Sequence, residues 1–282
     1  MKYTRFVNLI WFFFILGSGL LMFFVALSGA NTSSLLLKLY WLEADTTGFA
    51  QIGFNETRWY DYRLCSVNKV TGEALFCIDS RVAEPFDPAT NFGISDAMPT
   101  EFIKHRDTYY YLSRVGWSLA IAGLFFIVLS LVPGFFNLLM NDCSTMLIWL
   151  AVFTWVSFIL VAVSASLYTA CYVKAVKVFH EDNRSAQLGV KLFAFIWTSV
   201  FMLLVNCIIS VVGLATSQPV LAAETSGNYS PYPAAEPAPA DAYAATAPEA
   251  NEEPPTSTRG RFFTRVRRNK QPADNASNEH LA

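Results

Sequence analysis

Four long apolar runs are the feature that most constrains how this chain folds. They cover residues 6–30, 115–132, 146–173 and 192–215, and none of them contains Asp, Glu, Lys or Arg. A membrane hydrocarbon core about 30 Å thick requires roughly 20 apolar residues in a helix, so each run is long enough to cross it. The sequence therefore predicts an all-α membrane protein, a four-helix transmembrane bundle with spans over about 6–30, 110–133, 146–173 and 192–215.

The first run has one alternative interpretation, a cleaved signal peptide. Lys2 and Arg5 give it a basic start, and the small residues Gly29 and Ala30 stand near a candidate cleavage point. The apolar stretch is longer than the usual ~7 to 15 residues of a signal peptide, which favours an uncleaved helix.

Small residues are expected to let helices approach one another closely. In span one these are Gly17 and Gly19, and in span three they form a stripe of Ala162, Ser166 and Ala170. Span two is expected to end at Pro133-Gly134, since proline interrupts a helix.

The long loop at residues 31–108 is the one sizeable region expected to fold outside the bilayer. Aromatic, partly alternating stretches at 37–42 and 57–62 predict strands, and a turn between Asn68 and Gly72 leads to a third strand near 75–78. Cys65 and Cys77 lie in this region. Disulfides persist outside the cell, so an extracellular loop predicts a Cys65–Cys77 bond that staples a small β structure, whereas a cytosolic loop predicts two free thiols.

Charge alone leaves the orientation in the membrane open. Lys2 and Arg5 favour a cytoplasmic amino terminus, but four basic residues crowd the loop between spans three and four, which this orientation places outside: Lys174, Lys177, Arg184 and Lys191. Candidate glycosylation sites at Asn31, Asn55 and Asn183 lie in the two loops that would face outward. We therefore expect both termini to be cytoplasmic and loop 31–108 to be extracellular.

After the membrane domain, residues 1–215, the composition changes sharply. Residues 216–282 are rich in Pro, Ala, Glu, Ser and Thr, which predicts a disordered cytoplasmic tail. Its end carries a basic and aromatic patch at 259–270, with Arg259, Arg261, Phe262, Phe263, Arg265, Arg267, Arg268 and Lys270. Such a patch suits contact with anionic inner-leaflet lipid such as phosphoinositide, and a solvated basic tail is the alternative.

Reactive chemistry is sparse along the chain. The three histidines have no companions at metal-ligand spacing, and the common nucleophile, zinc and phosphate-loop motifs are missing from the sequence. We therefore expect no enzyme activity, no cofactor and no metal, and the net charge of −2 gives no reason to expect nucleic acid as a partner. Apart from Asn8 near the start of the first span, Asn206 is the single amide in the spans, expected to make an interhelical hydrogen bond or, in a small-solute channel or transporter, to contact a ligand. A lipid-modifying enzyme would need a reactive group that the sequence does not offer.

Four spans, with Trp59 ahead of Cys65 and Cys77 in loop one, resemble the claudin-type architecture, although Thr57-Arg58-Trp59 stands where claudins carry Gly-Leu-Trp. A more specific resemblance, over residues 1 to about 215, is to the fungal Sur-seven/PalI family. It rests on several blocks of residues: Ser28-Gly29-Ala30, Tyr40-Trp41-Leu42, Asp45-Thr46-Thr47-Gly48, Glu56-Thr57-Arg58-Trp59, Asn91-Phe92-Gly93, Arg106 to Arg114, and Arg184 to Gly189.

This resemblance implies a multi-pass plasma-membrane protein of eisosome-associated furrows, most similar to the sporulation-linked members. The implied roles are membrane lipid organisation, cell-wall integrity and ascospore formation. The implied partners are sterol, sphingolipid, eisosome or cortical proteins, and copies of itself or of paralogues. No catalytic site is carried over, and Trp41, Arg58, Trp59 and the two loop cysteines are expected to be structural positions.

Overall fold

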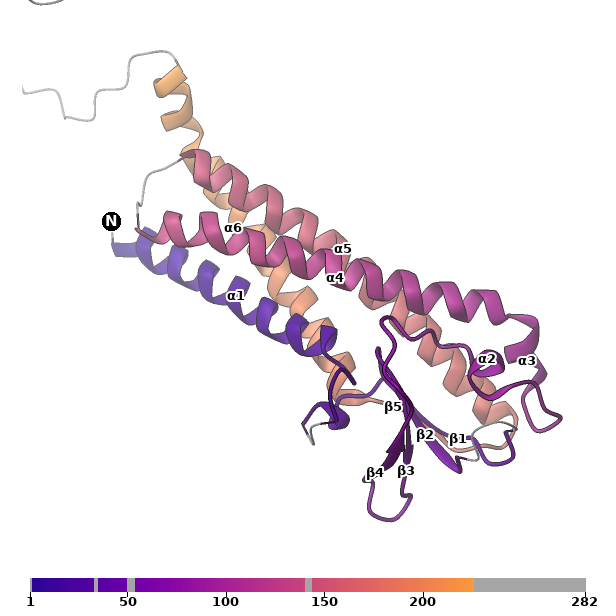
Figure 1. The fold of residues 1–282 in the computed structure, drawn as a ribbon. Helices are drawn as coiled ribbons and strands as arrows, with labels where there is room; N and C mark the ends of the chain where they lie inside the picture. Colours follow the sequence, from indigo (N-terminus) through magenta and orange to yellow (C-terminus); the bar gives the residue numbers. More distant parts are fainter. Residues whose placement is uncertain (1, 33–34, 50–53, 140–143, 226–282) are drawn as a thin grey trace, which may run out of the picture. The chain divides into compact units, whose positions relative to one another are not determined.

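The computed structural model describes residues 2–32, 35–49, 54–139 and 144–225, with backbone alone for 2–5, 144 and 216–225. Four long helices dominate it: α1 (Lys2–Ala26), α4 (Arg106–Leu139), α5 (Ser144–Glu181) and α6 (Val190–Thr225). All four are long and apolar enough to cross a membrane, as the sequence predicted. They pack side by side, α1 on α4 and α6, and α5 on the same two helices (Figure 1). The predicted four-helix bundle is thus confirmed.

Two of the helices are much longer than a bilayer core requires. Helix α4 has 34 residues and α5 has 38. At 1.5 Å per residue they extend about 50 Å and 57 Å, against a hydrocarbon core of about 30 Å. Figure 1 shows the first turns of α4 and the last turns of α5 continuing alongside a small β-sheet. These projecting turns are the support on which the sheet is built.

The predicted end of span two at Pro133 is wrong, because α4 continues through this residue to Leu139. Pro133 and Gly134 are both buried, and the α-carbon of Gly134 faces Phe12 of α1 and Leu150 of α5. Within a bilayer an interrupted helix exposes backbone groups that nothing can satisfy, whereas one proline-freed carbonyl can be accommodated between neighbouring helices. Helix packing therefore overrides the local effect of proline here.

The two predictions about small residues differ in outcome. Gly17 packs against Met202 of α6 and Gly19 against Ile127 of α4, so the close approach at α1 is confirmed. The stripe in span three is wrong, because Ser166 and Ala170 are exposed at the helix surface. The buried face of α5 is instead formed by Val161, Ala165, Tyr168, Cys171, Tyr172 and Ala175.

A five-stranded antiparallel sheet lies beside the helix ends. Its strands are β1 (Leu42–Asp45), β2 (Glu56–Trp59), β3 (Leu64–Val67), β4 (Ala74–Cys77) and β5 (Ala186–Leu188), in the order β4-β3-β2-β1-β5. Strand β5 comes from the connection between α5 and α6, so both loops on this side of the bundle contribute to one sheet (Figure 1). We call the sheet, with the helices α2 (Pro88–Phe92) and α3 (Thr100–Lys104), the sheet module.

The strand predictions were partly right. Strand β2 covers the first half of the predicted stretch 57–62. The turn from Asn68 to Gly72 leads into β4 as expected, and the Gly72 N–H donates to the Asn68 carbonyl at 2.8 Å. The strand predicted at 37–42 is wrong except for its last residue, since Leu36–Lys38 form a short 3₁₀ turn, η1. Neither β5 nor the two five-residue helices was predicted.

Candidate functional site: a sheet module fixed to the helix ends

A disulfide closes the outermost hairpin of the sheet. Cys65 in β3 and Cys77 in β4 are directly paired across the two strands, and their sulfur atoms are bonded at 1.99 Å. The bond confirms the predicted staple. Among the described strands β4 pairs with β3 only, because it is the edge of the sheet, and its Phe76 ring also contacts Phe54.

The disulfide is one end of a row of side chains that runs in register across all five strands. The row consists of Cys77, Cys65, Arg58, Glu43 and Gln187. Arg58 forms an ion pair with Glu43, and Gln187 donates to the other oxygen of the same carboxylate at 2.8 Å. Arg58 also donates to the Gly72 carbonyl at 2.8 Å and lies over the Tyr40 ring. Arg58 and the Glu43 carboxylate together therefore link β1, β2 and β5 with the hairpin turn.

Two tryptophans that the sequence marked as structural are buried where the module meets the helices. The Trp41 ring stacks on Tyr168 of α5 with centroids 4.1 Å apart, and it forms a T-shaped pair with Phe193 of α6. Trp59 packs against Phe86 and against Phe179 near the end of α5. Aromatic pairs in these geometries add to the stability that burial already provides. The core of the bundle therefore continues into the sheet module without a break.

A buried carboxyl group lies in the same contact. Asp61 is 4% exposed and accepts a hydrogen bond of 2.8 Å from the Tyr168 hydroxyl. Its second oxygen has no hydrogen-bond partner among the described residues. Burial raises the pKa of Asp61 to about 7, although hydrogen bonding from Tyr168 and the approach of the Trp41 indole N–H act in the opposite direction. No sequence motif signals this residue, because its burial arises only from the tertiary fold.

The end of α1 is tied to the module by Arg63. Its guanidinium donates to the carbonyls of Gly29, at 2.6 Å, and Ala30, at 3.1 Å. Gly29 has a φ of +74°, and a Cβ there would overlap the Cβ of Tyr60, so only glycine fits. Ser28 completes the junction by donating to the Leu39 carbonyl at 2.8 Å.

The connection between α5 and α6 is tied down in a similar way by Arg184. Its guanidinium donates at 2.8 Å to the carbonyls of Thr47 and Ala97, two separate segments of the first loop, and lies over the Phe49 ring. A few residues further on, the Gly189 N–H donates to the Trp41 carbonyl at 2.9 Å. A Cβ at Gly189 would overlap the backbone carbonyl of Tyr40, so the backbones can approach this closely only because this residue is glycine.

The remaining predicted residues are not gathered into one place. Asn31, Asn55 and Asn183 are all exposed, at separate points of the two loops. The basic patch at 259–270 lies outside the residues that the structure describes.

Asn206 differs from expectation. It is fully buried in α6, and neither atom of its amide has a hydrogen-bond partner among the described residues, so the expected interhelical bond is absent there. Within that same part of the chain, no group of three His, Cys, Asp or Glu residues could hold a metal ion.

Together these features define a four-span membrane protein whose two loops on one side fold into a single disulfide-closed sheet anchored on the helix ends. The chain belongs to the SUR7/PalI family, whose model matches residues 7–209. It is 49% identical over 216 residues to the SUR7 family protein FMP45 of Saccharomyces cerevisiae, covering 77% of this chain and 69% of that protein.

Two further relatives support the same assignment. The uncharacterized plasma membrane protein YNL194C of Saccharomyces cerevisiae is 44% identical over 216 residues, covering 77% of this chain and 71% of the relative. Protein SUR7 of Candida albicans is 29% identical over 269 residues, which cover 94% of this chain and 96% of the relative. The family resemblance found in the sequence is thereby confirmed.

Proposed function

We propose that this protein organises furrow domains of the plasma membrane that are associated with eisosomes. In this role it supports membrane lipid organisation, cell-wall integrity and ascospore formation. The observation that carries the proposal is the attachment of the sheet module: Arg63, Arg184 and Trp41 fix it to α1, α5 and α6, so it presents a rigid surface rather than a flexible loop. Membership of the SUR7/PalI family and a relative named as a plasma membrane protein support the cellular setting.

In the proposed orientation both termini are cytoplasmic and the sheet module is extracellular. The disulfide supports this, because such bonds persist in oxidising compartments. A membrane-impermeant amine reagent applied to intact spheroplasts should label Lys69, which is exposed on the β3–β4 turn, and should leave Lys270 of the tail unlabelled. Labelling of Lys270 with Lys69 protected would reverse the orientation.

The partners that we propose are sterol and sphingolipid around the bundle, eisosome or cortical proteins at the cytoplasmic side, and further copies of the protein or its paralogues. The basic patch at 259–270 is proposed to contact phosphoinositides, since each Lys or Arg near an anionic leaflet contributes about 1 kcal/mol. A tail peptide should bind phosphoinositide vesicles, and replacing Arg261, Arg265, Arg267 and Arg268 with Ala should release it. Unchanged binding of that variant would contradict the proposed contact between the basic patch and phosphoinositides.

The experiment that tests the main proposal is the localisation of a fluorescent fusion in vegetative and sporulating cells, beside a marker of cortical furrows. The proposal predicts stable patches that coincide with the furrows. An even distribution over the plasma membrane would contradict it.

A small-solute channel or transporter is the second candidate, and one observation favours it. The Asn206 amide is buried in the bundle without a partner among the described residues, and an unsatisfied polar group in a bilayer is costly unless water or a ligand meets it. Purified protein in liposomes would then give a solute flux that Asn206→Leu abolishes. Absence of flux for the native protein leaves the organising role as the better account.

A further inference from the structure

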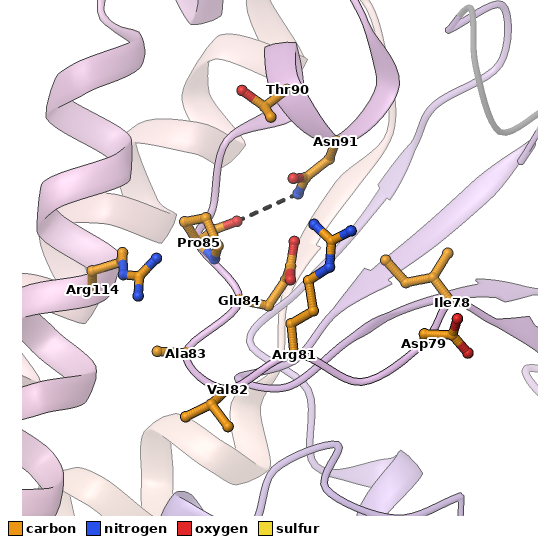
Figure 2. Close-up of a pocket in the computed structure, with 10 residues that line it drawn as sticks. All are labelled: Ile78, Asp79, Arg81, Val82, Ala83, Glu84, Pro85, Thr90, Asn91 and Arg114. Carbon is orange, nitrogen blue, oxygen red and sulfur yellow. Dashed lines mark hydrogen bonds between the residues drawn. The ribbon is translucent and has the colours of Figure 1, made fainter.

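A polar pocket of about 500 Å³ lies between the segment 78–85, helix α2 and the first part of α4. Its size falls in the range of small-molecule sites, which run from about 300 to 1,000 Å³. Such sites are usually lined mainly by apolar side chains. Here half of the lining residues carry charged or amide side chains, namely Asp79, Arg81, Glu84, Asn91 and Arg114. Figure 2 shows Arg81 and Glu84 pointing toward Asn91, with Arg114 on the opposite side.

Two guanidinium groups supply hydrogen-bond donors to the pocket. Among the described residues, no carboxylate lies within ion-pair distance of Arg81 or Arg114. The Arg114 side chain donates to the Tyr110 hydroxyl at 3.2 Å, which uses a single N–H of its five. Most of the donors of both arginines are therefore free to meet a ligand.

Acceptors face the same space. One oxygen of Glu84 is fully buried and has no hydrogen-bond partner among the described residues, although the residue lies in the wall of the pocket. Asn91 donates a weak hydrogen bond of 3.4 Å to the Pro85 carbonyl, which leaves its amide oxygen available. Asp79 is a further carboxylate among the lining residues, and Figure 2 shows it turned away from Asn91. The pocket thus offers donors and acceptors in comparable number, with charges of both signs.

The wall that carries Arg81 and Glu84 is held in one shape. Arg81 N–H donates to the Tyr62 carbonyl and Glu84 N–H to the Asp61 carbonyl, both at 2.8 Å. Between them Ala83 adopts a φ of +54°, a conformation that a residue with a Cβ rarely takes. Such strain persists only where surrounding structure enforces it, and it is concentrated at functional sites. The pocket is therefore preformed rather than created by a ligand.

We infer that this pocket binds a polyhydroxylated ring, a sugar or an inositol, either as part of a glycan or as the headgroup of a lipid. Each hydroxyl of such a ring both donates and accepts, which matches a lining that mixes guanidinium, carboxylate and amide groups. A simple anion fits less well, because Glu84 and Asp79 would repel it. Arg114 stands where the apolar part of α4 begins, so the pocket opens near the membrane surface and within reach of both sources.

The inference deepens the proposed function by giving the sheet module a ligand, and its extracellular placement rests on the proposed orientation. Binding is measured on the purified full-length protein in nanodiscs, so its failure and a failure of furrow localisation are separate results. The soluble probes are mannotriose, laminaritriose, myo-inositol, myo-inositol 1-phosphate and inorganic phosphate. A second set of nanodiscs contains phosphatidylinositol, which presents the ring on a lipid.

The expected result is binding of at least one ring-containing probe with a dissociation constant of about 1 mM or tighter. Arg81→Gln and Glu84→Gln should each weaken this binding by about tenfold or more, because each removes a charge-assisted hydrogen bond. Lys69→Gln is the matched control, a charge removed from an exposed site outside the pocket, and it should leave binding unchanged. Binding of soluble rings indicates a glycan, and binding of phosphatidylinositol alone indicates a lipid headgroup.

Three results would overturn the inference. They are no binding of any ring-containing probe, binding that survives in both pocket variants, and equal binding of inorganic phosphate without a ring. Thermal unfolding and formation of the Cys65–Cys77 bond establish that each variant is folded. If Glu84→Gln does not fold, Asn91→Ala replaces it, since Asn91 contributes its side chain to the same pocket and is only partly buried.

Discussion

The hydroxyl of Tyr168 in helix α5 donates a hydrogen bond of 2.8 Å to the carboxyl group of Asp61, 107 positions away in the chain. Both residues are buried, and the Trp41 ring lies on Tyr168 in the same cluster. This contact joins a transmembrane helix to the sheet module through a polar bond enclosed by aromatic rings. The fixed position of the module therefore depends partly on a group that can gain or lose a proton.

Stability should depend on pH through Asp61. Burial raises its pKa from about 3.8 to about 7 in the folded protein, so between these values the folded state binds a proton that the unfolded chain has released. The contribution of Asp61 to stability is therefore complete below about pH 4, falls as the pH rises through 7, and is then lost. Since one pKa unit corresponds to about 1.4 kcal/mol, the free energy of unfolding should fall by a few kcal/mol over this window.

The comparison that isolates this effect is Asp61→Asn. Unfolding of the nanodisc-embedded protein should become less dependent on pH between 4 and 7 in this variant. Asp96→Asn, at an exposed position, is the control and should keep the native slope. An unchanged slope in Asp61→Asn would mean that other carboxyl groups, such as the partly buried Glu84, account for the pH dependence.

The disulfide should stabilise the hairpin measurably. Its two cysteines are 12 positions apart, and closing a loop of this size stabilises a protein by about 3 kcal/mol in the chain-entropy model. Replacing both Cys65 and Cys77 with Ser should lower the midpoint of denaturant unfolding. A reducing agent should do the same to the native protein and have no effect on the double variant, whereas equal sensitivity of both proteins would place the effect of the reductant elsewhere.

Gly189→Ala should be among the most damaging single substitutions in the sheet module. The added methyl group would overlap the Tyr40 carbonyl, so β5 would have to leave the sheet or the backbone at Tyr40 would have to shift. We expect a loss of stability of about 3 kcal/mol or more, the level of severe backbone and packing changes. Gly213→Ala in α6 is the control, because a Cβ there meets its nearest atoms at 3.8 Å, an ordinary contact distance. Thermal unfolding of the two variants measures the difference.

Arg184→Ala should loosen two loop segments together. The guanidinium of Arg184 holds the exposed carbonyl of Thr47 and the partly buried carbonyl of Ala97. Losing the hydrogen bond from a charged donor to the partly buried acceptor costs about 1.5–3 kcal/mol. Hydrogen exchange should rise around both residues while the bundle core stays protected. Lys191→Ala, an exposed basic residue at the start of α6, is the matched control. An increase in hydrogen exchange around only one of Thr47 and Ala97 would show that Arg184 does not couple the two loop segments.

The sequence was most informative where one physical requirement dominated. Crossing a bilayer needs long apolar helices, and all four were predicted. The Cys65–Cys77 bond was foreseen on the expectation that the loop carrying both cysteines is extracellular, where disulfides persist. The predicted helix end at Pro133 was wrong, because the local preference of proline for a helix end is weaker than the cost of exposing backbone groups inside a membrane.

Features that arise from contacts between distant segments could not be read from the chain. Strand β5 has three residues, too few for a periodic signal, and it exists because Gly189 and Arg184 bring it against β1. Residues 39–41 look like part of a strand by composition, but Trp41 is used to pack against helices α5 and α6. The burial of Asp61 depends on Tyr168, and no local pattern relates the two residues.

We propose that the rigidly attached sheet module positions this protein in plasma-membrane furrows. The most direct measurement is the fraction of a fluorescent fusion that coincides with a furrow marker, for the native protein, for Cys65→Ser with Cys77→Ser, and for Lys69→Gln as a control, each at matched surface expression. We expect patches at furrows for the native protein and the control, and dispersal over the membrane for the double variant. Native protein spread evenly over the membrane, or a double variant that stays in furrows although its module is unfolded, would contradict it.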